Sequence, residues 1–376
     1  MSTTTKPPAN PVELTGSRHI LGWLHEQRVS LVFTTYQSCR LLLMGLHENG
    51  RLSAFERLFD RAMGLYATPE RLYMSSRFQL WRFENMLAPG ETHNGYDKLY
   101  VPRAGYTTGD LDTHDIVLAS APGFESGPEP ALVFVNTQFN CLATLSTRHS
   151  FRPLWKPPFI SKWIGEDRCH LNGLALAGGR PRYVTAVSRS DVVDGWRDRR
   201  RDGGVVIDVG SNEIVAGGLS MPHSPRFYRD RLWLLNSGTG EFGTVDLADG
   251  RFEPVVFCPG YARGLAFWRQ YAIIGLSRAR ESTFTGLALD EQLSARDTEA
   301  RCGLLIVDLD SGDVAHWIRL EGVITELYDV QVLPGVRKPT ALGFQSDEIA
   351  NRMWMEPPVQ GTGIRNTAPS VPIPDP

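Results

Sequence analysis

Short apolar runs, broken about every 8–12 residues by Gly, Asp, Asn or Pro, fill the chain between residues 29 and 345. Strands of this length with turn residues at this spacing are typical of an all-β sandwich, barrel or propeller. Only Ser17–Gln27 has helical periodicity, with its first residue as a candidate N-cap and Ile20, Leu21 and Leu24 on one side. The pattern therefore predicts an all-β domain with one short N-terminal helix.

An internal repeat separates these architectures. A two-strand phrase recurs, with a Gly-Leu step in the first strand at Gly64, Gly173 and Gly264, and with second strands that end on Ser or Asn. Third and fourth strands follow, joined by Asp-Gly or Ser-Gly turns, and four such strands make one propeller blade. The predicted blades lie at about 58–88, 112–156, 168–219, 220–258 and 260–321. A sandwich or two stacked β domains is the alternative, but a repeat of about 45–55 residues favours the propeller.

The two ends of the strand pattern supply a sixth blade. Asp329–Pro334 is predicted as its first strand and Thr340–Gln345 as its second, and Val29–Thr35, Cys39–His47 and Arg51–Arg57 complete it. Joining N- and C-terminal strands in one blade removes the open edge that each end would otherwise present. We therefore predict a single six-bladed β-propeller domain over residues 16–354.

Both ends of the chain are rich in Pro, Thr and Ser and lack apolar periodicity. Such composition cannot bury enough apolar surface to order the chain. We predict disordered tails at residues 1–15 and 355–376.

The starts of the first strands carry the candidate chemistry, because in a propeller they converge on one axis. Three histidines fall there in consecutive blades, at His114, His170 and His223, and Glu326 stands opposite. Imidazoles and a carboxylate are the donor set that Fe, Mn, Zn or Cu prefers. The sequence predicts a transition metal held by these four residues. His223 lies one residue out of register with His114, so it needs a bulge to point inward.

Other polar residues lie at or near the same strand starts. Asp115, Asp329 and Tyr328 are candidate catalytic groups, with the acids as base or as support for the metal site. The candidate substrate-binding residues are Asn172, Arg226, Arg263 and Arg278, since guanidinium groups suit carboxylate or phosphate. Structural ion pairing of these arginines is the alternative.

Two long insertions, at 189–204 and 278–297, interrupt the strand pattern. Long loops in compact folds are often functional. Each is a lid over the channel or a solvated loop.

Charge and composition narrow the partners. A net charge of -3 and a pI near 6.3 leave no basic surplus for nucleic acid. No apolar stretch approaches the roughly 20 residues of a membrane helix, and Met1–Pro11 has no hydrophobic signal core, so we expect a cytoplasmic protein without a membrane partner. The five cysteines are scattered singly and are expected to be reduced. No P-loop or Gly-x-Ser-x-Gly motif occurs.

Several stretches resemble a bacterial family of conserved proteins of unknown function. They are His170–Ala175, Met221–Arg226, Leu232–Glu241 and Pro259–Ala266. The resemblance covers most of residues 28–345. It implies a propeller-like fold and no settled activity.

A weaker resemblance, at the level of the fold, is to the six-bladed lactonase and gluconolactonase propellers, whose axial Ca²⁺ is held by Glu, Asn and Asp. It implies Glu326, Asn172 and either Asp115 or Asp329 as ligands here. Three histidines depart from that pattern, because they are poor ligands for Ca²⁺. A histidine-lined centre looks more like those of metal-dependent lyases and iron oxygenases.

We therefore predict a metal-dependent enzyme, of oxygenase or lyase type, that acts on a small anionic substrate in the central channel. One alternative is a non-catalytic propeller that binds a protein or peptide partner. The other is a Ca²⁺-dependent hydrolase of the lactonase kind.

Overall fold

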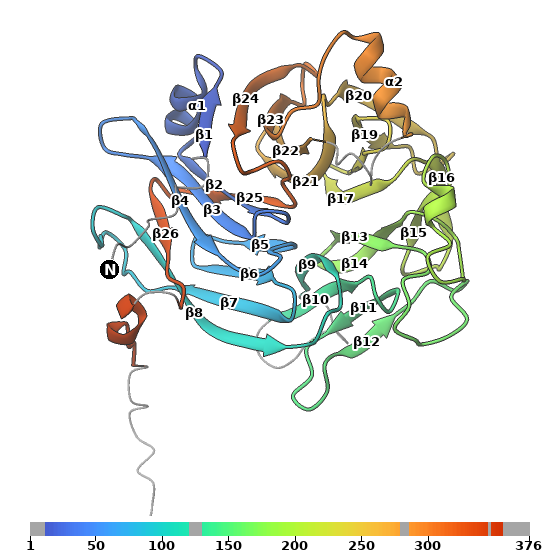
Figure 1. Ribbon diagram of the computed structural model, residues 1–376, viewed down its shortest axis with the longest axis horizontal. Coiled ribbons are helices and arrows are strands. Elements are labelled where there is room, and N and C mark those ends of the chain that lie inside the picture. The colour runs from blue at the N-terminus through green and yellow to red at the C-terminus, as the bar shows by residue number, and fades with distance from the viewer. Residues whose placement is uncertain (1–11, 120–129, 279–285, 345–346, 356–376) are drawn as a thin grey trace, which may run out of the picture.

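The computed structural model describes residues 12–119, 130–278, 286–344 and 347–355. Within these ranges the strands form six sheets arranged around a central axis, as Figure 1 shows. The predicted six-bladed β-propeller is confirmed.

Each blade runs from an inner strand at the axis to an outer strand at the rim. The inner strands are β5 (Leu65–Ala67), β9 (Thr113–Ala119), β13 (Leu171–Ala177), β17 (Pro222–Tyr228), β21 (Tyr261–Trp268) and β25 (Val330–Pro334). The second strands are β2 (Val29–Thr35), β6 (Arg71–Ser75), β10 (Ala131–Asn136), β14 (Arg180–Ala186), β18 (Arg231–Asn236) and β22 (Tyr271–Ser277). The third strands are β3 (Arg40–Leu46), β7 (Gln79–Asn85), β11 (Cys141–Thr144), β15 (Gly204–Asp208), β19 (Glu241–Val245) and β23 (Gly303–Asp308). The fourth strands are β4 (Leu52–Leu58), β8 (Lys98–Thr107), β12 (Arg152–Trp155), β16 (Ile214–Leu219), β20 (Phe252–Phe257) and β24 (Val314–Glu321).

The closing blade pairs strands from the two ends of the chain, as predicted, in the order β25-β2-β3-β4. Its second strand is β2 and not Thr340–Gln345, so that part of the prediction is wrong. The reason is that β2 is buried along its whole length and pairs with β25 on one edge and β3 on the other, which leaves no free edge.

Two further strands extend the rims of other blades. β26 (Pro339–Ala341) runs parallel to β8, in the blade that follows the closing one. That blade reaches Thr107, well beyond the predicted limit of residue 88. β1 (Glu13–Gly16) pairs with β24, so the propeller begins inside the range 1–15 that the sequence assigned to a tail. The rest of the two predicted tails, residues 1–11 and 356–376, lies outside the described residues.

The predicted N-terminal helix is present as α1 (Ile20–Gln27) and packs against the core through Ile20, Trp23 and Leu24. Its N-cap residue is His19 and not the expected Ser17, and the His19 side chain makes no capping hydrogen bond. Leu21, expected on the buried side of the helix, is 37% exposed. Trp23, three residues after Ile20, lies on the buried side instead. The short helices α2 (Ala288–Ala295), η1 (Arg197–Arg199) and η2 (Asp347–Asn351) lie in connections.

A recurring hydroxyl contact joins neighbouring blades near the axis. A Ser or Thr within one residue of the end of one blade's second strand donates to a backbone carbonyl at or just before the start of the next blade's first strand. The pairs are Thr34 to Met63, Ser75 to Thr113, Thr137 to Leu171, Ser237 to Ala262 and Ser277 to Leu327, at 2.5–3.0 Å. Of the predicted second-strand ends, Ser277 makes this contact itself, while at Asn136 and Asn236 the next residue, Thr137 or Ser237, makes it. The hydroxyl contact also fixes the position of the residue that follows each accepting carbonyl. In four blades that residue lines the axis, and these residues are His114, Asn172, Arg263 and Tyr328.

Two of the repeated glycines are required by the close approach of neighbouring inner strands. A Cβ on Gly173 would lie 2.3 Å from Pro225 Cδ, and one on Gly264 would lie 2.8 Å from Asp329 Cα. Gly264 also has a φ of +77°, in the left-handed region that favours glycine. The Gly-Leu repeat therefore reflects packing at the axis.

No helix among the described residues is long and apolar enough to cross a membrane. All five cysteines are free thiols, as expected, and Cys39 alone among them is not fully buried.

Candidate active site

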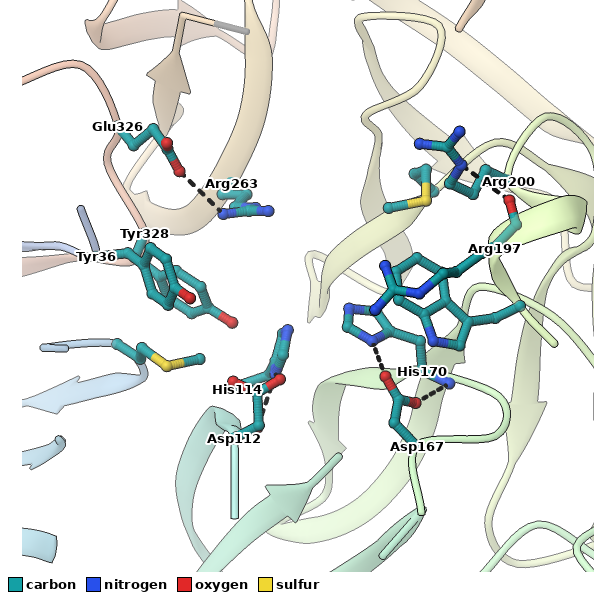
Figure 2. Close-up of a pocket in the computed structure, with 13 residues that line it drawn as sticks. Tyr36, Asp112, His114, Asp167, His170, Arg197, Arg200, Arg263, Glu326 and Tyr328 are labelled. Carbon is teal, nitrogen blue, oxygen red and sulfur yellow. Dashed lines mark hydrogen bonds and ion pairs between the residues drawn. The ribbon is translucent and has the colours of Figure 1, made fainter. Parts of the chain in front are cut away.

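A cavity of about 390 Å³ opens on the axis at one end of the propeller. Figure 2 shows side chains pointing into it from several blades and from the insertion at 189–204. Its lining consists of Tyr36, Met63, Asp112, His114, Asp167, His170, Trp196, Arg197, Arg200, Met221, Arg263, Glu326 and Tyr328. Of the predicted site residues, His114, His170, Glu326, Arg263 and Tyr328 meet here.

His114 is held in one tautomer. Its Nδ1 lies 2.8 Å from the backbone oxygen of Asp112 and 2.8 Å from Thr137 Oγ1, whose own proton goes to Leu171 O. A carbonyl only accepts, so Nδ1 carries the proton and Nε2 keeps a lone pair. Burial lowers the pKa of His114 to about 4, and the imidazole is therefore neutral near pH 7.

His170 is oriented by a carboxylate. Its Nδ1 donates to Asp167 Oδ2 at 2.7 Å, and its backbone N–H donates to Asp167 Oδ1 at 2.9 Å. The ring stacks on Trp196 with centroids 4.2 Å apart and stands edge-on to His114 at 4.8 Å. These contacts hold His170 Nε2 as the free basic atom of an Asp–His pair.

Arg263 places a fixed positive charge in the cavity wall. Its Nη1 lies 3.8 Å from Glu326 Oε2, and its guanidinium lies over the rings of Tyr261 and Tyr328 at 4.9 and 5.3 Å. Tyr328 also stacks on Tyr36, with centroids 6.0 Å apart. Burial raises the pKa of Tyr328 well above its usual value, so the hydroxyl stays protonated and acts as a donor.

The insertion at 189–204 forms one wall of the cavity. It supplies Trp196, Arg197 and Arg200, and Arg200 Nε donates to the backbone oxygen of Arg197 at 2.9 Å. Trp196 packs in a cluster with Leu289 and Leu293 of α2, so the second insertion supports the first. Residues 279–285 of that second insertion lie outside the described residues.

Asp115 and Asp329 sit below the cavity in an ion cluster with Arg226. Arg226 donates to both oxygens of Asp115, at 2.7 and 3.2 Å, and its Nη2 lies 3.9 Å from Asp329 Oδ1. The carboxylates also accept backbone N–H groups of neighbouring inner strands, from Leu174 and Leu65 respectively. These interactions tie the blades together at the axis. Structural ion pairing, left open by the sequence for Arg226, is what the structure shows.

The remaining predicted residues lie apart from the cavity. His223 and Asn172 face a smaller chamber beneath it. The bulge that His223 was expected to need is present, between His223 and Arg226 in β17. Arg278 lies at another surface hollow, with Nη2 3.8 Å from Glu321 Oε1.

The predicted metal ligands do not fit a metal ion. Among the described residues, no group of three or more His, Cys, Asp or Glu side chains is placed to hold one. His223 faces the chamber while Glu326 faces Arg263, whose permanent charge opposes a divalent cation. The predicted Ca²⁺ ligands Asn172, Asp115 and Asp329 line the smaller chamber, whereas Glu326 lines the cavity above it.

Sequence reasoning missed several lining residues. Asp167 lies three residues before His170, a spacing that offered a signal for the Asp–His pair. Tyr36 follows a second strand, and Met63 and Met221 begin first strands, but their residue types suggested no chemistry. Trp196, Arg197 and Arg200 were visible only as part of a charged insertion.

A family model described as a domain of unknown function, DUF4915, matches residues 18–342. The chain belongs to this family. No curated protein matches the sequence.

Solved structures of similar shape share little sequence with this DUF4915 protein. A nidogen/laminin complex chain is 13% identical, with 82% of this chain and 99% of that chain covered and a TM-score of 0.49. TolB from Acinetobacter baumannii is 10% identical over 81% and 66% of the two chains, with a TM-score of 0.44. Virginiamycin B lyase from Staphylococcus aureus is 10% identical over 82% and 99%, with a TM-score of 0.39.

Proposed function

We propose that the central cavity is the active site of a lyase-type enzyme that removes a proton from a small anionic substrate. The observation that carries this proposal is the Asp167–His170 pair, held at 2.7 Å beside Arg263 in one cavity. An oriented imidazole and a nearby guanidinium are the parts that proton abstraction next to a carboxylate requires.

His170 is the proposed general base. Its Nδ1–H is fixed on Asp167, so Nε2 is the atom that takes the proton, and the carboxylate stabilises the imidazolium that forms. Trp196 holds the ring plane by stacking. The edge-on ring of His114, held neutral by burial, adds no opposing charge when His170 becomes protonated.

Guanidinium groups hold the anionic end of the substrate. Arg263 lies in the inner wall, and Arg197 and Arg200 lie across the cavity on the insertion (Figure 2). Guanidinium groups bind carboxylates with paired hydrogen bonds, and partial burial strengthens that attraction. Tyr328 adds a hydroxyl donor for the oxygen on which negative charge develops.

The proposed step balances without a further reagent. His170 Nε2 takes a proton from the carbon next to the carboxylate, and the C–H electron pair forms an enolate held by Arg263 and Tyr328. The enolate then forms a carbon–carbon double bond and expels the substituent on the next carbon with its bonding pair. The leaving group departs as an anion or takes the proton back from His170.

Anion binding is the first test. Isothermal titration with succinate, malate, citrate and inorganic phosphate measures affinity for the wild type, Arg263→Gln and Arg278→Gln. We expect Arg263→Gln to weaken binding at least tenfold, the size of one lost charge-assisted hydrogen bond. Arg278→Gln is the matched control, since Arg278 lies outside the cavity, and equal losses in both variants would contradict the proposal.

Proton abstraction is the second test. In D₂O, proton NMR follows exchange of the C–H hydrogens next to the carboxylate in succinate and malate. Exchange is expected to be catalysed by the wild type and lost in His170→Ala, with Asp167→Asn at least a hundredfold slower. Binding without exchange would overturn the enzyme assignment in favour of a non-catalytic propeller. Exchange that survives His170→Ala would exclude His170 as the base.

A further inference from the structure

A second, smaller chamber lies on the axis beneath the cavity. Its volume is about 10 Å³, which is the space that one water molecule requires. Its walls are His114, Asp115, Asn172, His223, Ser224, Arg226, Arg263, Tyr328 and Asp329. Three of these residues, His114, Arg263 and Tyr328, also line the cavity above and form the partition between the two spaces.

His223 Nε2, Asn172 Nδ2 and the hydroxyl of Tyr328 are among the polar atoms of this wall that are buried without a hydrogen-bond partner in the described residues. All three side chains belong to residues that are at most 5% exposed. A buried polar group left unpaired costs about 1–3 kcal/mol, so three around one small space indicate a bound molecule.

The hydrogen-bonding capacity of two of these atoms is fixed by their other contacts. His223 Nδ1 lies 2.8 Å from the backbone oxygen of Met221, so the ring proton is on Nδ1 and Nε2 only accepts. Asn172 Oδ1 accepts from Thr185 Oγ1 at 2.7 Å, which turns its amide NH₂ toward the chamber as a donor. These three side chains therefore offer the chamber an acceptor on His223, a donor on Asn172 and a hydroxyl on Tyr328 that does either.

We infer that the chamber holds one buried water molecule that sets the direction of the Tyr328 hydroxyl. The water accepts from Asn172 Nδ2 and donates one proton to His223 Nε2. Its second proton goes to the oxygen of Tyr328. In this arrangement the Tyr328 proton points away from the water, toward the cavity.

This assigns His223 a role as a positioning residue for Tyr328. The inference deepens and rests on the proposed function, because a Tyr328 hydroxyl that always donates into the cavity recognises an anion or a developing oxyanion. Without the acceptor at His223, the water turns and Tyr328 can donate to it instead. A Tyr328 hydroxyl that only donates prefers a substrate oxygen that only accepts a hydrogen bond. The tautomer of His223, which lies outside the cavity, therefore sets this selectivity.

Neutron diffraction of deuterated crystals of the full chain tests the water directly. We expect one D₂O in the chamber, a deuteron on His223 Nδ1 and none on Nε2, and the Tyr328 deuteron pointing into the cavity. An empty chamber, or a Tyr328 deuteron on the chamber water, would overturn the inference. This result does not depend on any ligand. The neutron structure therefore shows whether the chamber holds the water even if the proposed function fails.

A double-mutant cycle tests the coupling of His223 to Tyr328, with the affinity for succinate and for inorganic phosphate as the readout. His223→Phe and Tyr328→Phe are each expected to weaken binding about tenfold, and the double variant no further, because both remove the same donor. His223→Gln retains an acceptor oxygen and is expected to remain within about threefold of the wild type.

Additive losses would show that His223 acts independently of Tyr328 and would contradict the positioning role. Equal losses in His223→Phe and His223→Gln would point to packing and contradict it as well. Thermal melting of each variant checks that the propeller is folded. If neither anion binds the wild type, the proposed function fails, and the neutron structure alone decides the water.

Discussion

Removing Arg226 is expected to destabilise the whole propeller, because this side chain joins the inner strands. Its guanidinium donates to both oxygens of Asp115 and to the backbone oxygens of Leu174, Pro225 and Leu265. In the Arg226→Met variant the buried carboxylates of Asp115 and Asp329 lose their cation. Breaking a buried pair by removing one partner costs about 3–5 kcal/mol.

The stability lost on breaking an ion pair depends on how far its side chains are exposed to solvent. The Arg226 side chain is 18% exposed, and those of Asp115 and Asp329 are 4% and 6% exposed. The control is Arg229→Met, which breaks an ion pair of 2.9 Å whose partners Arg229 and Asp310 are 45% and 70% exposed. An exposed pair of this kind contributes at most about 1 kcal/mol.

Urea unfolding followed by tryptophan fluorescence, with wild type and both variants at pH 7, gives the comparison. The Arg226→Met midpoint is expected to fall several times further than the Arg229→Met midpoint. Adding Asp115→Asn to Arg226→Met removes one unpaired charge and should restore part of the loss. Equal midpoints for the two single variants would refute the reasoning that the axial ion cluster holds the blades together.

The dependence of stability on pH gives further predictions. Burial lowers the pKa of His114 from 6.5 to about 4, so the unfolded chain binds a proton at this residue more readily than the folded one. The contribution of neutral His114 to folding stability is therefore complete above pH 6.5 and is lost as pH falls through 4. His114→Gln should therefore flatten the acid side of the urea-midpoint profile by up to about 3 kcal/mol, and an unchanged slope would contradict the assigned burial. Burial and the neighbouring Asp115, opposed by Arg226, raise the pKa of Asp329 from 3.8 to about 7. The contribution of Asp329 to folding stability is complete below pH 3.8 and is lost as pH rises through 7. The urea midpoint of Asp329→Asn should therefore decline less between pH 5 and 8 than that of the wild type. Parallel midpoint profiles would rule this out.

The blade architecture could be predicted because it repeats. Two inner strands carry a residue without a Cβ where a neighbouring strand approaches, at Gly173 and Gly264, and these positions are visible in the sequence. The turns between third and fourth strands also repeat, with Asp208, Asp246 and Asp308 each accepting a backbone N–H two residues later. Local chemistry of this kind leaves a periodic signal.

The place of β26 could not be predicted from such signals. Its three residues carry no pattern that distinguishes the edge of β25 from the edge of β8. β26 pairs with β8 because β2 already occupies the edge of β25. That occupancy is a property of the assembled sheet. Competition between strands for one edge is not encoded in either strand alone.

The convergence of His114, Arg263 and Tyr328 could be predicted, since all three stand at starts of inner strands. The residues from loops could not. Arg197 and Arg200 reach the cavity because Trp196 packs against α2, a contact between two insertions that are far apart in sequence. Loops follow such contacts and not a period, so a repeat gives no position for their side chains.

The same convergence explains why residue types alone favour a metal at this centre. The repeat brings Arg263 to the axis at a place equivalent to His114, because Ala262 and Thr113 accept the same interblade hydroxyl contact. Residue types alone give imidazoles and a carboxylate, the donor set of a metal. Adding one permanent cation among them reverses the preference, since a guanidinium repels a divalent ion and attracts an anion over the same distance. The chemistry that the centre can support therefore depends on Arg263 as much as on its histidines.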